Sequence, residues 1–214
     1  MYLFGRRAQL SGAKFRKSLE WVGEITNRVS QTTGLQVRVW NQMFSPAVGT
    51  ILWATTVPDL ATLEAANDKL LVDEDYTDLL DKGQDYTLPG LVDDILAVIV
   101  SGQPDPNREL NYVNSVRAHI VGGKTATGMA LGVEIAERAS AIIGVPTVFI
   151  AEATGDYGSV GWVTGFADDA EMERGLLAIN GDPKFIEFLD SKTKGVYNDV
   201  PGSATQVVYR RIPV

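Results

Sequence analysis

Cysteine is absent from this chain of 214 residues, and histidine occurs once, as His119. The lack of cysteine excludes disulfide bonds, thiolate metal ligands and a cysteine nucleophile. A single histidine excludes a histidine-rich metal site within one chain, so no metal site is expected. Positive charge is also scarce: the chain has 19 Lys and Arg residues and 27 Asp and Glu residues, which gives a net charge of −8. This balance argues against binding to nucleic acid or to an anionic membrane, which both need a basic surface.

Long apolar runs are lacking as well. The segment Ile95–Val100 has the length of a strand, far short of the ~20 apolar residues of a membrane-spanning helix. The N-terminal sequence Met1–Arg7 lacks the apolar segment of a signal peptide. We therefore expect a cytoplasmic protein that makes no membrane contact. With 45% hydrophobic and 21% charged residues, the chain has the composition of a globular protein that buries a sizeable core.

What the chain does contain is an internal repeat. The sequence of Trp53–Asp59, WATTVPD, recurs in altered form as WVTGFAD at Trp162–Asp168. The acidic helix start at Asp73 recurs at Asp182 with the same offset of 109 residues. Because such matches stay in step along most of each half, we interpret the chain as the product of a duplication.

Each half is predicted to have the element order βαββαβ. Alternating apolar residues predict strands in the first half at 2–10, 35–44, 50–56 and 95–100. An apolar stripe predicts a helix over 14–33 that ends at Gly34, and Asp59 and Asp73 are expected to cap two shorter helices. Turns are expected at 45–49 and at Pro89-Gly90, before the last strand.

The second half repeats these elements. Arg117–Ile120 in its first strand matches Arg7–Leu10 at an offset of 110. A helix is expected over 126–143, strands at 145–153, 160–166 and 206–212, and helix caps at Asp168 and Asp182. We predict a first unit at 1–100, a linker rich in Pro and Gly at 101–110, and a second unit at 111–214.

A βαββαβ unit forms a four-stranded antiparallel sheet with both helices on one face. The opposite face of the sheet must be covered, and two copies can cover each other sheet to sheet. We therefore predict the α+β class, with two tandem ferredoxin-like units.

The halves resemble the dimeric α/β-barrel superfamily, and within it the NIPSNAP-like and stress-responsive barrel types. The residues that carry this resemblance are the strand-to-helix junction Trp162–Asp168, its echo at Trp53, and the short Asp-capped helix that follows. It implies a dimeric-α/β-barrel-type architecture in which two ferredoxin-like units form a barrel whose interior often holds a ligand. Some relatives bind haem through a helical histidine. His119 is predicted in a strand, so no haem or other cofactor is expected.

Candidate site residues follow from the two-residue period of a strand. If the apolar residues of the first strand in each half face the helices, the polar ones between them face the barrel. His119 is then a candidate general base with Arg117 beside it. We expect Arg7, Gln9, Arg38 and Tyr209 to contact a ligand. The alternative is a buried polar network that holds the sheets together.

Trp53 and Trp162 occupy matching positions and are candidates for an aromatic wall against a flat ligand, or for ordinary core residues. Gly122–Thr125 has the context of a phosphate loop, but the full pattern requires glycine at the position of Ala118. Acidic clusters at helix starts are explained by the helix dipole without a metal.

These residues favour a small-molecule-binding α/β barrel, acting as a cofactor-independent monooxygenase, cyclase or isomerase on a hydrophobic compound. The alternative is a non-enzymatic interaction or assembly protein of the same fold, which would show a filled interior and a large apolar surface patch. The expected partners are a hydrophobic small molecule and further copies of the chain in a homo-oligomer.

Overall fold

The computed structural model describes residues 1–44, 47–105 and 107–214. The chain divides into two compact units. Unit 1 comprises Met1–Leu96 and Arg210–Val214, and unit 2 comprises Ala97–Tyr209. The turn predicted at 45–49 and the linker predicted at 101–110 both include residues outside the described part of the chain. The predicted domain boundaries stay a prediction.

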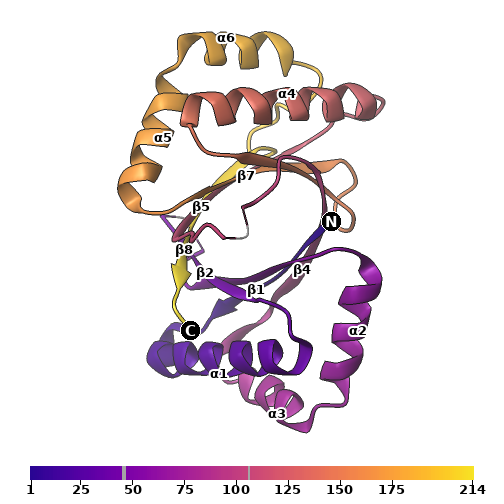
Figure 1. Ribbon diagram of the computed structural model, residues 1–214, viewed down its shortest axis with the longest axis vertical. Helices are drawn as coiled ribbons and strands as arrows, with labels where there is room; N and C mark the ends of the chain where they lie inside the picture. The colour runs from indigo at the N-terminus through magenta and orange to yellow at the C-terminus, as the bar shows by residue number, and fades with distance from the viewer. Residues whose placement is uncertain (45–46, 106) are drawn as a thin grey trace. The chain divides into compact units, whose positions relative to one another are not determined.

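Unit 1 is a ferredoxin-like layer of helices on a sheet. Its elements are β1 (Tyr2–Leu10), η1 (Gly12–Lys14), α1 (Phe15–Thr33), β2 (Arg38–Met43), β3 (Thr50–Val57), α2 (Leu60–Leu71), α3 (Glu74–Gly83) and the larger part of β4 (Thr87–Ser101). β3 lies between β1 and β2, antiparallel to both, with Trp53 opposite Arg6 on one side and Val39 on the other. The three α-helices lie on one face of this sheet (Figure 1), as the βαββαβ order predicts.

Unit 2 repeats this arrangement. Its elements are β5 (Tyr112–His119), α4 (Thr125–Ile143), β6 (Thr147–Glu152), β7 (Ser159–Phe166), α5 (Asp169–Gly181), α6 (Pro183–Lys192) and most of β8 (Thr205–Ile212). β7 lies between β5 and β6, with Trp162 opposite Val116 and Phe149. Helices α4, α5 and α6 lie on one face of these strands (Figure 1). No helix in the described part of the chain has the length and apolar character of a membrane-spanning segment.

The helix ends confirm the predicted caps. The side chain of Asp73 accepts a hydrogen bond from the backbone N–H of Tyr76 at 3.0 Å, and Asp182 accepts one from Phe185 at 2.8 Å. Asp59 and Asp168 cap α2 and α5 in the same way. The long helices α1 and α4 end at glycines with left-handed backbone angles, Gly34 (φ 74°) and Gly144 (φ 82°).

The end of the first half differs from the prediction. β4 begins at Thr87, so Pro89 and Gly90 lie inside the strand and do not form a turn before it. Gly90 has a φ of 75°, a backbone angle that glycine adopts without strain and that bends a strand without ending it.

The tryptophans of the two units occupy equivalent positions, as the repeat predicts. The indole N–H of Trp162 donates to the carbonyl oxygen of Gly132 in α4 at 2.9 Å. The indole N–H of Trp53 reaches the matching helix turn through Thr26, whose hydroxyl accepts at 2.9 Å and donates to the carbonyl oxygen of Val22 at 2.6 Å. In both units, therefore, the indole ties the central strand to the long helix.

Candidate functional site

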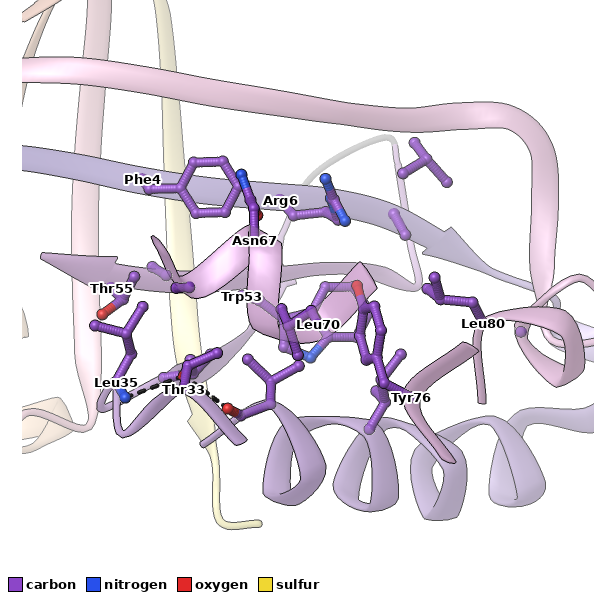
Figure 2. Close-up of a pocket in the computed structure, with 18 of the residues that line it drawn as sticks. Phe4, Arg6, Thr33, Leu35, Trp53, Thr55, Asn67, Leu70, Tyr76 and Leu80 are labelled. Atoms are coloured by element: carbon purple, nitrogen blue, oxygen red, sulfur yellow. Dashed lines mark hydrogen bonds between the residues drawn. The ribbon is translucent and has the colours of Figure 1, made fainter. Parts of the chain in front are cut away.

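A cavity of about 290 Å³ lies within unit 1, between the helices and the sheet. Figure 2 shows side chains from the strands and from all three helices around it, among them Phe4, Trp53, Leu70 and Tyr76. Its lining is mainly aliphatic and aromatic. Pockets that bind small organic molecules have this composition, with a few polar groups at defined places.

The walls of the cavity are held by partly buried hydrogen bonds. Trp21 of α1 and Trp53 of β3 meet edge to face, with ring centroids 5.9 Å apart. The indole N–H of Trp21 donates to the carbonyl oxygen of Leu79 at 2.7 Å, and that of Trp53 donates to Thr26. Because both indole N–H groups are satisfied within the protein, the rings line the cavity as apolar surfaces. Ala66 of α2 is a small buried residue that also lines the space.

Arg6 supplies the charge at this cavity. It lies on β1 between Phe4 and Ala8, which both line the same space. Its Nε and Nη2 atoms donate to the two carboxylate oxygens of Asp94 at 2.7 and 2.8 Å. These bonds raise the pKa of Arg6 above its ordinary value, with a smaller contribution from Tyr76. The guanidinium therefore stays charged, and Figure 2 shows the hydroxyl end of Tyr76 directed towards it.

Tyr76 is positioned by the start of α3. Asp73 caps this helix and also accepts hydrogen bonds from the guanidinium of Arg28, at 2.7 to 2.9 Å, and from the hydroxyl of Thr32, at 2.5 Å. The bonds from Arg28, followed by the bond from Thr32, lower the pKa of Asp73 to about 2. The carboxylate therefore stays ionised in neutral solution and joins α3 to α1, which fixes one wall of the cavity.

The predicted site residues of unit 1 lie on two different faces of its sheet. Arg7, Gln9 and Arg38 are on the face without helices, as strand alternation predicted. Arg7 pairs with Asp93, with N···O distances of 3.0 and 2.6 Å, and Gln9 donates to a backbone carbonyl. Trp53 lies on the opposite face, under the helices, so it does not line the same surface as Arg7.

Unit 2 shows the same division. Arg117 forms an ion pair with Glu152, whose carboxylate is buried, on the helix-free face. Trp162 lies on the helix-covered face, stacked on Phe149 at 5.4 Å between ring centroids. Tyr209 is buried in β8. Glu152 is thus the anionic partner of Arg117, whose own side chain is partly exposed.

His119 also lies on the helix-free face of unit 2. Its Nε2 atom is 2.8 Å from the hydroxyl oxygen of Ser159 and 3.6 Å from a carboxylate oxygen of Asp156. Both partners meet the same ring nitrogen, whereas a Ser-His-Asp triad uses the two nitrogens separately. Catalytic roles for His119 and Arg117 stay a prediction.

Sequence reasoning missed Arg6 and Tyr76. The signal for Arg6 was present, because a two-residue period places it with Phe4 and Ala8 on the apolar face of β1. A charge on such a face needs a partner or a function. The sequence pattern grouped Tyr76 with the apolar residues of a short helix. No neighbouring residue indicated that its hydroxyl lies near an arginine from another element.

No protein-family model and no curated protein sequence matches this chain. Solved structures of similar fold do exist. A proposed monooxygenase from Fusobacterium nucleatum subsp. nucleatum matches with a TM-score of 0.71 and 8% identity over 99% of this chain and 92% of its own. An anthrone oxidase-like protein matches with a TM-score of 0.67 and 10% identity over 99% and 91% of the two chains. A proposed monooxygenase from Lactobacillus acidophilus matches with a TM-score of 0.61 and 7% identity over 98% and 93%.

These structural matches establish the fold, but at such low sequence identity they leave the activity open. The element order, the strand register within each unit and these structural matches agree with one another. The chain therefore has the fold of the dimeric α/β-barrel superfamily, built from two tandem ferredoxin-like units.

Proposed function

We propose that unit 1 binds a small hydrophobic, largely aromatic compound in its cavity and that the protein oxidises this compound as a cofactor-independent monooxygenase. The observation that carries the proposal is the cavity itself, about 290 Å³ in volume and walled by two indole rings and aliphatic side chains. The reaction type is supported by the structures of similar fold, which are described as proposed monooxygenases and as anthrone oxidase-like.

The cavity suits a flat ligand because its aromatic walls are rigid. The indole N–H groups of Trp21 and Trp53 are held by the protein, and a buried aspartate fixes the start of α3. A preorganised apolar pocket loses little free energy to side-chain ordering when a ligand enters. Each square ångström of apolar ligand surface removed from water then contributes roughly 25 cal/mol.

Anthrone is a suitable first probe because it is flat, apolar and oxidisable. Monooxygenation with O2 would convert anthrone to anthraquinone, with one oxygen atom entering the product and the other leaving as water. We expect binding by isothermal titration calorimetry and the uptake of one O2 per anthrone at an oxygen electrode. Binding without O2 uptake would refute the monooxygenase activity while leaving the binding function standing.

A matched pair of alanine substitutions in α2 tests the site. Ala66 is buried and lines the cavity, whereas its neighbour Ala65 is exposed. Ala66→Leu places three additional carbon atoms in the cavity, so anthrone affinity should fall at least about tenfold, or about 1.4 kcal/mol. Ala65→Leu should leave the affinity unchanged. Equal affinities of the two variants would place the ligand elsewhere and overturn the proposal.

A further inference from the structure

The two units differ at four of the polar residues that line the cavity. In unit 1 these groups are Arg6, Thr33, Asn67 and Tyr76. The repeat aligns them in unit 2 with Val116, Ile143, Leu176 and Phe185, which are all apolar. The polar groups and the cavity are thus found together in one copy of a duplicated unit.

The corresponding region of unit 2 is filled by larger side chains. Phe149 and Phe166 are fully buried where unit 1 has Val39 and Val57. A Cβ atom on Gly175, which aligns with Ala66, would lie only 2.7 Å from Ile143 and 2.9 Å from Phe166. The same fold therefore fills this layer in unit 2 with apolar residues at the four positions compared, so the fold does not require the polar groups that unit 1 has there.

Polar residues that unit 2 places in this layer satisfy one another. Asn114, which aligns with Phe4, accepts a hydrogen bond from Gln206 at 3.0 Å. The hydroxyls of Thr147 and Thr164 lie 2.8 Å apart. In unit 1, Arg6 pairs with Asp94 and, together with Tyr76, also lines the cavity (Figure 2).

We infer that Arg6 and Tyr76 form the polar end of the unit 1 cavity and select a flat apolar ligand that carries one anionic oxygen group, such as a carboxylate, phenolate or enolate. This inference rests on the proposed binding function and adds the charge of the ligand to it. A guanidinium carries five N–H groups, and Asp94 receives bonds from two nitrogens, Nε and Nη2. The other N–H groups and the Tyr76 hydroxyl can donate to an oxygen placed in the cavity.

Asp94 sets both the geometry and the strength of this recognition. Its two bonds hold the guanidinium plane in place, while its negative charge offsets that of Arg6. The side chains of Arg6 and Asp94 are 41% and 47% exposed, so the polar end of the cavity is open to water. Screening by water keeps the preference for an anion moderate, at about tenfold.

Naphthalene-2-carboxylate and naphthalene-2-carboxamide test the inference because they have the same rings and shape and differ in charge. Isothermal titration calorimetry should show about tenfold tighter binding of the carboxylate by the wild-type protein. Arg6→Leu should abolish this difference by weakening carboxylate binding alone. Tyr76→Phe, which introduces the residue used by unit 2, should reduce it by about threefold.

Two further variants distinguish recognition from a structural role. Asp94→Asn should tighten carboxylate binding several-fold, because the charge of Arg6 is no longer offset. Arg7→Leu is the matched control, since Arg7 is the neighbouring arginine, is also paired with an aspartate and lies on the opposite face. It should leave the ratio of the two affinities unchanged.

The outcomes separate the inference from the function on which it depends. Equal affinities for carboxylate and amide in the wild-type protein would overturn the inference and leave the cavity as a binding site. Equal effects of Arg6→Leu and Arg7→Leu would overturn it as well. If neither probe bound and Ala66→Leu changed nothing, the proposed function would fail and the inference with it.

Discussion

Gly132→Ala measures how completely the helix-covered layer of unit 2 is filled. A Cβ atom at this position in α4 would lie 2.1 Å from Cζ and 2.4 Å from Cε2 of Phe149, whereas carbon atoms in contact are normally about 3.5–4.0 Å apart. The Phe149 ring is fully buried and stacked on Trp162. It therefore has no open space into which it can move.

The expected magnitudes come from this geometry. Overpacking of this kind costs about 3 kcal/mol, and the gain in helix propensity from glycine to alanine returns about 1 kcal/mol. Gly132→Ala should therefore destabilise the protein by about 2 kcal/mol. Phe149→Val, which introduces the residue of unit 1, should cost about 3 kcal/mol as a large-to-small core substitution. In the double variant the new methyl group occupies vacated space, so the overpacking cost disappears and the total should be about 2 rather than 5 kcal/mol.

Urea denaturation followed by circular dichroism provides these free energies of unfolding. Gly23→Ala in α1 is the matched control, because the nearest atom to its new Cβ is a Val214 methyl group at an ordinary 3.9 Å. This control should gain up to about 1 kcal/mol. If the double variant lost the sum of the two single losses, to within about 0.5 kcal/mol, the account of this layer as filled by Phe149 would be refuted.

Two further predictions concern ionisable groups. The pKa of Asp73 is lowered to about 2 by Arg28, so the stability that it contributes is complete above the unfolded value of ~4 and is lost as the pH falls towards 2. Asp73→Asn should flatten the fall of the urea midpoint between pH 4 and 2. His119→Gln should keep a hydrogen bond to Ser159 and leave the affinity of the unit 1 cavity for anthrone unchanged. A loss of affinity would instead indicate that the ligand binds near His119, as first predicted from the sequence.

Local signals were sufficient for the elements and their faces. Asp59 and Asp73 begin helices because their side chains accept backbone N–H bonds, which depends on residues three positions away. The two-residue period of β1 correctly placed Arg7 and Gln9 on the helix-free face. The Pro89-Gly90 pair misled the prediction because its effect on the strand depends on neighbouring chain segments and not on the dipeptide.

The cavity could not be predicted in the same way. It depends on side-chain volumes from six elements, and no segment alone shows whether these side chains fill the space between the helices and the sheet. The face occupied by Trp53 depends on the register between β1 and β3, which sets Trp53 opposite Arg6. A shift of that register by one residue would move Trp53 to the other face, so the sequence of β3 alone does not determine which face Trp53 occupies.

Duplication explains how one fold carries both a solid layer and a cavity. A cavity removes packing contacts and therefore costs stability, and charged residues beside it cost more unless they are paired. In this chain the second copy is filled by Phe149 and Phe166, while the first retains space beside Arg6. The two copies thus differ in a few side chains while they keep the same backbone fold. The binding function that we propose therefore concerns unit 1, and unit 2 keeps the same fold with a close-packed layer.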